Sequence, residues 1–255
     1  MHFKEYNDKL ENILPIIPDK SVQLIFADFP YNTTNLNFDK NVIDLEQFWL
    51  NANRILKDNG VVVCTCSFPF TAKLAMSNIK NLRYDLVYQK THPTGHLNAK
   101  KMPMRAHENI LVFYNKLPKY NPQKTTGHKR KVSSKKSKIS AYSKRINEDK
   151  VYGMENMDNF QDYNSTERYP LSVQVFSSDK QKLKLINKTQ KPENLLEWII
   201  KTYTDENDTV LDPCRGSNTT GVVCKKLNRN YIGIELDTEQ FIKGLKRLEN
   251  EIYGK

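Results

Sequence analysis

The sequence predicts an α/β protein with a doubly wound, mostly parallel sheet. Short, mostly apolar runs of strand length, for example 22–26 and 60–66, alternate with longer segments whose apolar residues recur at helical spacing. Such runs are typical of strands buried on both faces of a parallel sheet. The chain has 255 residues, which is enough for one such domain carrying an insertion.

The first half of the chain contains four predicted strands and two predicted helices. The strands are expected at 22–26, 60–66, 84–90 and 109–114. A helix over 44–57 follows Asp44, a residue suited to cap a helix N-terminus, and Ser67 and Pro69 open a second helix. Residues 94–108 are polar and basic without clear periodicity, so we expect a long functional loop at the carboxyl edge of the sheet.

The second half begins with a segment in which regular structure is hard to recognise. Polar residues and Tyr dominate 117–184, and we interpret this range as an inserted, partly mobile segment. A helix is expected from Pro192, then a strand from Thr209, a small-residue turn, a helix, and a strand ending at Glu235. The predicted organisation is therefore one domain in two halves, 1–116 and 185–255, interrupted by 117–184.

The formal net charge of +11 is concentrated in one segment. Between Lys116 and Lys150, twelve Lys and Arg residues accompany two acidic residues, a local excess of ten. This segment favours a polyanionic partner, with a solvated loop as the alternative. No apolar run reaches the length of a membrane span and no signal-peptide core is present, so we expect a cytoplasmic protein. The four cysteines lack metal-ligand spacing, and we expect reduced thiols and no metal.

The predicted strand over 22–26 ends at the stretch Asp28-Phe29-Pro30-Tyr31. Pro30 has no N–H to donate to a sheet and biases Phe29 toward an extended conformation, so the strand stops here. An acidic side chain, exposed carbonyls and an aromatic ring thus lie at the carboxyl end of a strand, where open α/β sheets bind ligands. Taken alone, the four residues favour an ordinary strand end followed by a turn.

A second candidate site is the sequence of strand, turn, helix and strand near the C-terminus, which is the layout of a nucleoside-binding site. Glu235 lies 23 residues after Asp212 and is placed to accept both hydroxyls of a ribose. The turn keeps only Gly216 and Gly221 of the glycines used for a pyrophosphate, and Asp212 would repel an anion. A cationic amino or sulfonium ligand suits the turn better, which favours S-adenosylmethionine over NAD.

Together the motifs resemble the β-class amino-methyltransferases of DNA, in particular the adenine-N6 enzymes of bacteria and their phages. The family's Asp-Pro-Pro-Tyr is matched by 28–31, and its Thr-Gln-Lys-Pro by 189–192. Its loop with Asn-Ala-Lys-Lys and Arg-x-His-Glu is matched within 98–108, and its Asp-Pro-Phe-x-Gly-Ser-Gly-Thr-Thr by 212–220. The catalytic motif precedes the cofactor motif, as in the β-class, and the similarity is weakest over 124–163.

The resemblance implies a permuted, Rossmann-like methyltransferase fold with an inserted basic target-recognition segment. It implies site-specific methyl transfer from S-adenosylmethionine to the N6 amine of an adenine flipped out of double-stranded DNA. Ionised Asp28 and the Phe29 carbonyl would hold the two N–H groups of the amine, and Tyr31 would stack on the base. The catalytic residues implied are Asp28, Phe29, Pro30 and Tyr31. A bacterial cell, or one infected by phage, is the expected location.

The resemblance also implies cofactor and DNA contacts. The cofactor residues are Thr189, Gln190, Lys191, Pro192, Asp212, Pro213, Gly216, Ser217, Asn218, Thr219, Thr220 and Glu235. For Lys191, contact with the cofactor carboxylate and simple solvation are both open. The DNA-binding residues are Asn98, Lys100, Lys101, Arg105, His107, Lys129, Arg130, Lys131, Lys135 and Lys136. Arg105, His107 and Glu108 either line the target pocket or form a buried hydrogen-bond network.

Four departures from the family pattern stand out. Phe29 replaces a proline, Cys214-Arg215 replaces Phe-x, and Asn187-Lys188 replaces His-Pro. Asn218 replaces the second glycine of the turn. Asparagine is the best non-glycine residue for a positive φ, but we expect its side chain to take space near the cofactor and to weaken binding.

Three hypotheses follow for the function. An adenine-specific DNA methyltransferase is preferred. A cytosine-N4 enzyme of the same class is ranked low, because those enzymes usually carry serine where Asp28 stands. A DNA-binding protein with a defunct cofactor site is suggested only by Asn218. The sequence leaves open the recognition sequence, a partner nuclease and the oligomeric state, for which a homodimer is one option.

Overall fold

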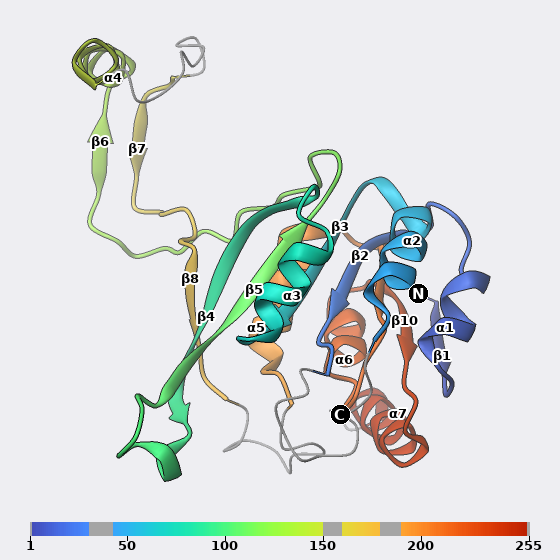
Figure 1. The fold of residues 1–255 in the computed structure, drawn as a ribbon. Helices are drawn as coiled ribbons and strands as arrows, with labels where there is room; N and C mark the ends of the chain where they lie inside the picture. Colours follow the sequence, from blue (N-terminus) through green and yellow to red (C-terminus); the bar gives the residue numbers. More distant parts are fainter. Residues whose placement is uncertain (1, 31–42, 150–159, 179–189, 254–255) are drawn as a thin grey trace. The chain divides into compact units, whose positions relative to one another are not determined.

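The computed structural model describes residues 2–30, 43–149, 160–178 and 190–253 (Figure 1). The chain divides into a main unit, formed by 1–121 and 171–255, and a second unit, formed by 122–170. No helix in the described ranges has both the length and the apolar character needed to cross a membrane.

The main unit is organised around an eight-stranded sheet. In spatial order its strands are β1 (Phe3–Tyr6), β10 (Asn230–Ile234), β9 (Thr209–Asp212), β2 (Val22–Ala27), β3 (Leu56–Cys66), β5 (Arg105–Phe113), β4 (Leu82–Thr94) and β8 (Val173–Phe176). Only β5 runs antiparallel to its neighbours β3 and β4, and the other five pairs are parallel. The predicted doubly wound, mostly parallel α/β fold is confirmed.

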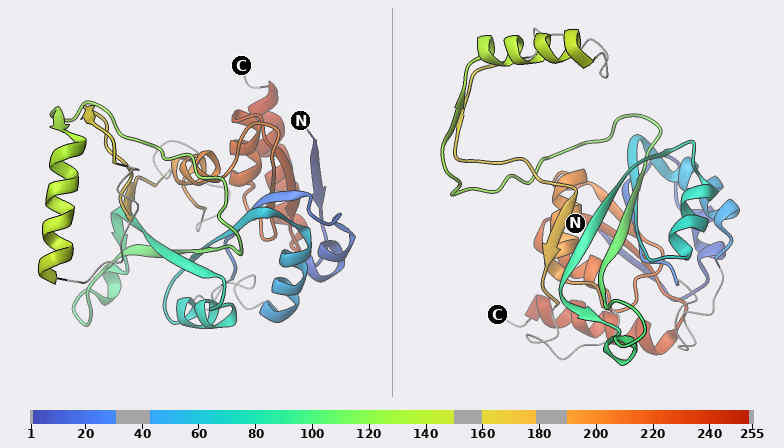
Figure 2. Two further views of the ribbon diagram at one scale, coloured as in Figure 1. Left: turned by 90° about the horizontal axis from the view of Figure 1, so that it is seen from above. Right: turned by 60° about the vertical axis from the view of Figure 1, so that its left-hand side comes forward.

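Helices cover both faces of this sheet. One face carries α1 (Leu10–Ile13), the 3-10 helix η1 (Leu14–Ile16), α2 (Leu45–Ile55) and α3 (Phe70–Ser77). The other carries α5 (Glu193–Tyr203) and α6 (Thr219–Lys226), with α7 (Thr238–Tyr253) packed beside α6. In the right-hand view of Figure 2 the sheet separates α2 and α3 from α5.

The apolar run of β2 is explained by this double covering. Ile25 and Ala27 point into the core under α2, whereas Leu24 and Phe26 point into the core under α5. All six residues of β2 are buried, and the one polar residue among them, Gln23, donates a hydrogen bond from Nε2 to the Asn59 carbonyl. Asp44 caps α2 as predicted, and its carboxylate accepts hydrogen bonds from two backbone N–H groups of the first turn.

The loop expected over 94–108 is present but shorter, because residues 105–108 belong to a strand. β4 continues to Thr94 and β5 begins at Arg105, so the segment is a hairpin whose tip contains the 3-10 helix η3 (His96–Asn98). The outer part of this hairpin, residues 91–105, is exposed. Because neither face is covered, the sequence shows no apolar alternation there.

The second unit contains regular structure that the sequence did not reveal. Strands β6 (Lys131–Ser133) and β7 (Tyr163–Ser165) pair antiparallel, and α4 (Lys135–Asp149) follows β6. A further bridge joins Thr125 to Arg168. α4 lacks an apolar stripe, which removed the periodicity that identifies helices. The second unit covers the middle of the segment expected at 117–184, and its role in target recognition stays a prediction.

Candidate active site

The predicted catalytic and cofactor motifs meet at one edge of the sheet. β2 and β9 are neighbours, and the chain continues from β2 to one side of the sheet and from β9 to the other. Ligands bind at such a switch point, outside the carboxyl ends of the strands. Asp28 directly follows β2, Asp212 ends β9, and Glu235 directly follows β10. All three acids therefore belong to the same edge.

Thr65 and Lys191 hold the carboxylate of Asp28. The Thr65 hydroxyl donates a 2.5 Å hydrogen bond to Asp28 Oδ1, and Lys191 Nζ donates a 2.7 Å bond to Asp28 Oδ2. Thr65 lies in β3, and Lys191 lies just before α5. The acid is therefore held at a fixed position, with 25% of its side chain still exposed.

Lys191 also faces a second carboxylate, that of Glu108 on β5. Its Nζ lies 3.3 Å from Glu108 Oε2, while Lys90 Nζ on β4 lies 2.6 Å from Glu108 Oε1. We call Asp28, Lys90, Glu108 and Lys191 the catalytic cluster. Burial alone would lower the pKa of Lys191, but the two carboxylates outweigh burial and raise it. Burial alone would raise the pKa of Glu108, but the ammonium groups of Lys191 and Lys90 outweigh burial and lower it. Lys191 and Glu108 are thus both held in their charged forms.

Of Arg105, His107 and Glu108, only one takes part in this buried arrangement. Residues 105 and 107 share the exposed face of the β5 extension, whereas Glu108 is buried on the opposite face. Only Glu108 joins the buried network. Lys191 is not simply solvated, since its side chain is 11% exposed and ion-paired.

Phe29 serves the core as well as the motif. Its side chain is buried, and its ring meets Phe48 of α2 edge-on with centroids 4.9 Å apart. A proline at this position would lose that aromatic contact, so the departure from the family pattern has a packing reason. Pro30 is half-buried, and Tyr31 lies outside the described residues.

The turn after β9 presents two acids with raised pKa values. Asp212 accepts hydrogen bonds from the Thr220 hydroxyl and from the Cys214 N–H, yet burial raises its pKa to about 7. Glu235 accepts from the backbone N–H groups of Gly216 and Asp237, both at 2.9 Å, and burial raises its pKa.

The negative charges of three acids act on the thiol of Cys214. Burial raises the pKa of this thiol, and the carboxylates of Asp212, Glu235 and Asp28 raise it further. A cluster of acids at the ends of neighbouring strands suits a ligand that carries positive charge. Gln190 adds a buried Oε1 that has no hydrogen-bond partner in the described structure. This donor and acceptor set fits a cationic nucleoside such as S-adenosylmethionine.

The turn itself confirms one expectation about Asn218 and corrects another. Asn218 has φ 61° and ψ 31°, the left-handed conformation expected for a glycine substitute. Its side chain is fully buried, and Nδ2 donates to Glu5 Oε1 at 2.9 Å and to the Gly244 carbonyl at 3.3 Å. The side chain therefore points between β1 and α7, and the expectation that it takes space near the cofactor is wrong.

Arg215, the other departure in this turn, joins the same buried group. Its Nε lies 3.1 Å from Glu5 Oε2, and its guanidinium stacks 4.5 Å above the Phe241 ring. We call Glu5, Arg215 and Asn218 the turn cluster. Because two of its members stand in the turn, the turn cluster ties the turn to β1 and α7.

The remaining predicted cofactor residues that the structure describes lie in this turn or at the start of α5. Gly216 has φ +48°, and the hydroxyls of Ser217 and Thr219 lie 3.2 Å apart. Arg247 of α7 donates to the Ser217 carbonyl and to Thr219 Oγ1. Pro213 is buried and Pro192 caps α5. Thr189 lies outside the described residues, as do Asn187 and Lys188.

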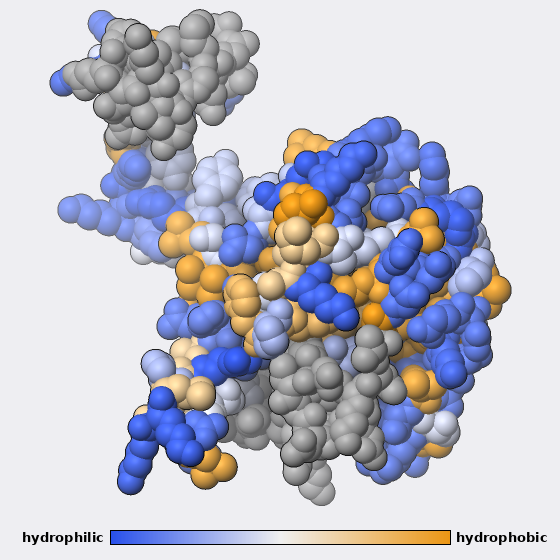
Figure 3. Space-filling model, in the orientation of Figure 1, coloured by the Kyte–Doolittle hydropathy of each residue, from blue (hydrophilic) through white to orange (hydrophobic). Residues whose placement is uncertain are grey.

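The predicted DNA-binding residues are exposed and fall into two groups. Asn98, Lys100, Lys101, Arg105 and His107 lie on the β4–β5 hairpin of the main unit, which is largely hydrophilic in Figure 3. Lys129, Arg130, Lys131, Lys135 and Lys136 lie in the second unit. Within the part of the chain that the structure describes, the latter five make no side-chain ion pair.

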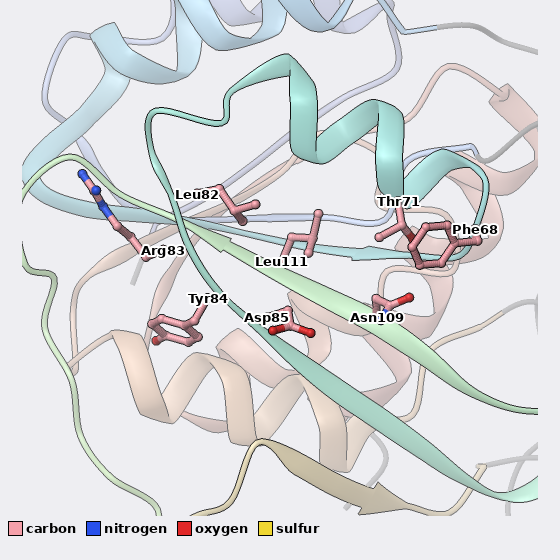
Figure 4. Close-up of a pocket in the computed structure, with 8 residues that line it drawn as sticks. All are labelled: Phe68, Thr71, Leu82, Arg83, Tyr84, Asp85, Asn109 and Leu111. Atoms are coloured by element: carbon pink, nitrogen blue, oxygen red, sulfur yellow. The ribbon is translucent and has the colours of Figure 1, made fainter. Parts of the chain in front are cut away.

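A pocket of about 390 Å³ lies on the α3 side of the sheet. Thr71 of α3 faces Asp85 of β4 and Asn109 of β5 across it (Figure 4). None of the predicted catalytic or cofactor residues lines this pocket, so we do not assign it to the active site.

Sequence reasoning missed three residues that support the site: Thr65, Lys90 and Glu5. Thr65 had a recognisable signal, because a polar residue near the end of a buried apolar strand needs a partner. Lys90 and Glu5 are ordinary charged residues within strands, and their roles depend on partners elsewhere in the sequence.

Comparisons with known proteins agree with this site. The family model described as DNA methylase matches residues 22–244. Type II methyltransferase M.BglII from Bacillus subtilis is 28% identical over 92% of this chain and 66% of its own length. DNA adenine methyltransferase YhdJ from Escherichia coli is 29% identical over 91% of this chain and 78% of its own.

Solved structures show the same fold. The M1.HpyAVI–SAM complex superimposes with a TM-score of 0.65 at 25% identity, covering 96% of this chain and 98% of its own. The cytosine-N4-specific PvuII DNA methyltransferase, at 14% identity and a TM-score of 0.63, shares the fold over 100% of this chain and 94% of its own. With a family model covering most of its length and the acids of its motifs at one sheet edge, the chain belongs to the DNA methylase family.

Proposed function

We propose that the protein is a site-specific DNA methyltransferase that transfers the methyl group of S-adenosylmethionine to the N6 amine of adenine. The observation that carries the proposal is the meeting of Asp28, Asp212 and Glu235 at the switch point between β2 and β9. Asp28 favours adenine over cytosine, since the cytosine-N4 enzymes usually carry serine here. Named relatives from bacteria include an adenine methyltransferase.

Asp28 acts by positioning. The amine of adenine is a poor nucleophile because its lone pair is delocalised into the ring. An ionised carboxylate and the Phe29 carbonyl accept the two N–H groups and turn the lone pair toward the reaction partner. When bound, S-adenosylmethionine supplies an electrophilic methyl group. Asp28 then stabilises the positive charge that develops on the amine, without any covalent intermediate on the protein.

The C-terminal half of the site provides the carboxylates and the acceptor that bind S-adenosylmethionine. Glu235 is aimed by two backbone N–H groups, which leaves carboxylate lone pairs for the ribose hydroxyls. Asp212 would attract the cationic amino group of S-adenosylmethionine, and Gln190 Oε1, which has no hydrogen-bond partner among the described residues, offers one further acceptor.

Double-stranded DNA is the proposed substrate, contacted by the exposed basic residues of the hairpin and of the second unit. Neutralising Lys129, Arg130, Lys131, Lys135 and Lys136 should weaken DNA binding. It should also reduce the slope of log affinity against log salt by roughly 0.9 for each phosphate that the protein no longer neutralises. An unchanged slope would show that these residues do not contact DNA.

The relatives named Type II methyltransferases suggest a role in modification of bacterial DNA, and we infer a bacterial cytoplasmic location. A homodimer stays a prediction. The decisive test is incubation of the protein with unmethylated DNA and methyl-labelled S-adenosylmethionine, followed by nucleoside analysis. We expect label in N6-methyladenine, and sequencing of the product then gives the recognition site. Label in N4-methylcytosine, or no incorporation, would contradict the proposal.

A further inference from the structure

Lys191 is bound to the carboxylate that the target amine is proposed to use. Asp28 Oδ1 accepts from the Thr65 hydroxyl, and Asp28 Oδ2 accepts from the Lys191 ammonium at 2.7 Å. An adenine amine and a lysine ammonium are both N–H donors, so both seek the lone pairs of this carboxylate. A carboxylate oxygen has two lone pairs, so an amine that binds Oδ2 must share this oxygen with the Lys191 ammonium while Lys191 stays on it.

Glu108 is close enough to Lys191 to become its main ion-pair partner. Its Oε1 is held by Lys90 at 2.6 Å, which fixes the carboxylate. Its Oε2 is buried and lies 3.3 Å from Lys191 Nζ, a longer contact than the 2.7 Å bond between Lys191 and Asp28. A small movement of the flexible lysine side chain therefore exchanges one charged partner for another without leaving the ammonium unpaired.

We propose that Lys191 is a positioning residue that occupies Asp28 in the free enzyme and passes to Glu108 when the target amine arrives. The inference rests on the proposed adenine-N6 function. Moving Lys191 has a chemical benefit, because methyl transfer creates positive charge on the amine, and an ammonium still bound to Asp28 would oppose that charge. After the exchange, the Asp28 carboxylate faces the amine, and Glu108 neutralises Lys191.

The test compares two duplexes that carry the recognition site, one with adenine and one with purine at the target position. Purine lacks the 6-amino group, so the ratio of the two dissociation constants isolates the contribution of the amine. Binding is followed by fluorescence anisotropy at pH 8.5 with a non-transferable analogue of S-adenosylmethionine. The variants are Lys191→Met, Glu108→Gln and the double variant.

The inference predicts opposite signs for the two single variants. Lys191→Met should raise the preference for adenine roughly tenfold, about the value of one charge-assisted hydrogen bond. Glu108→Gln should lower the preference, because Lys191 loses its alternative partner. The double variant should return to the level of Lys191→Met, since the competitor is gone.

A matched control is Lys201→Met, which removes an ammonium from α5 that pairs with Glu197 and not with the catalytic cluster. It should leave the preference unchanged. If Lys191 has only a structural role, Lys191→Met should weaken binding of both duplexes equally, and that result would overturn the inference. A lower preference for adenine in Lys191→Met would also overturn it. If Lys191→Met does not fold, the volume-preserving Glu108→Gln variant still tests the predicted sign. Failure of the native protein to methylate adenine would overturn the proposed function before any variant is made.

Discussion

The catalytic cluster and the turn cluster are both buried groups of charge at the ends of neighbouring strands, but they are held in different ways. In the catalytic cluster the cations are lysines, and Asp28 is still 25% exposed. In the turn cluster the cation is Arg215, whose side chain is 0% exposed. Lysine is a flexible point charge, whereas arginine is a planar group whose position is fixed by several contacts.

Packing accentuates this difference. A Cβ at Gly244 would overlap Arg215 Nη1, and one at Gly233 would come within 2.8 Å of Arg215 Cδ. The two glycines therefore leave just enough space for the arginine. The contrast indicates that the turn cluster is a rigid support for the cofactor turn, while the catalytic cluster can rearrange when a base enters.

The largest expected effect is on catalysis. Asp28→Ala removes the acceptor of the amine, and kcat should fall by about a hundredfold to a thousandfold. Because Asp28 also pairs with Thr65 and Lys191, we expect the free energy of unfolding to fall by about 1–2 kcal/mol. Methylation assays and urea unfolding measure the two quantities. Wild-type turnover in this variant would refute the proposed orientation of the amine.

Arg215→Met tests the rigidity of the turn cluster. It leaves the Glu5 carboxylate buried without its cation, which should cost about 3 kcal/mol in urea unfolding. Adding Glu5→Gln should recover part of this loss, because the uncompensated charge is removed. Equal stability of the single and double variants would show that the pair does not support the turn electrostatically.

The pKa of Asp212 gives a pH dependence to cofactor binding. Burial raises this pKa to about 7, so the carboxylate is ionised above pH 7 and gains a proton below it. The affinity for cationic S-adenosylmethionine should therefore fall as pH decreases below 7, by up to about tenfold per unit. Calorimetric titration with S-adenosylmethionine from pH 5.5 to 8.5 measures this affinity. Asp212→Asn is the control, and its affinity should no longer depend on pH in this range. A flat profile for the native protein would remove Asp212 from the cofactor site.

Asn218→Gly has the smallest expected effect. Relief of the left-handed conformation contributes about 1 kcal/mol, but the substitution also breaks the hydrogen bond to Glu5, so stability should change little or fall. The exposed Asn207, with φ 65°, is the matched control, and Asn207→Gly should be neutral or stabilising. Since the Asn218 side chain points away from the turn's ligand side, cofactor affinity should stay within about threefold. Much tighter binding by the glycine variant would support the steric interpretation drawn from the sequence.

The same comparison explains what the sequence could and could not predict. The strand at 22–26, the Asp44 cap and the left-handed conformation of Asn218 depend on local patterns, and the structure confirms all three. The Asn218 side chain is directed by Glu5, which is 213 positions away in the sequence. Lys191 pairs with Asp28, which is 163 positions away. No local pattern encodes such partners.

Local patterns also failed where burial is absent. The β4–β5 hairpin and α4 are exposed on most sides, and neither needs an apolar stripe. The sequence therefore identified the chemistry of the site better than these exposed elements.

The most direct test of the account is a structure of the protein with its target DNA and a non-transferable analogue of S-adenosylmethionine. We predict that Lys191 Nζ lies about 2.8 Å from Glu108 Oε2, with the adenine amine on Asp28 in its place. The Glu5–Asn218 and Glu5–Arg215 contacts should be unchanged. An adenine amine seated on Asp28 with Lys191 still bound to the same carboxylate oxygen, or a turn cluster that reorganises with the cofactor, would contradict the account.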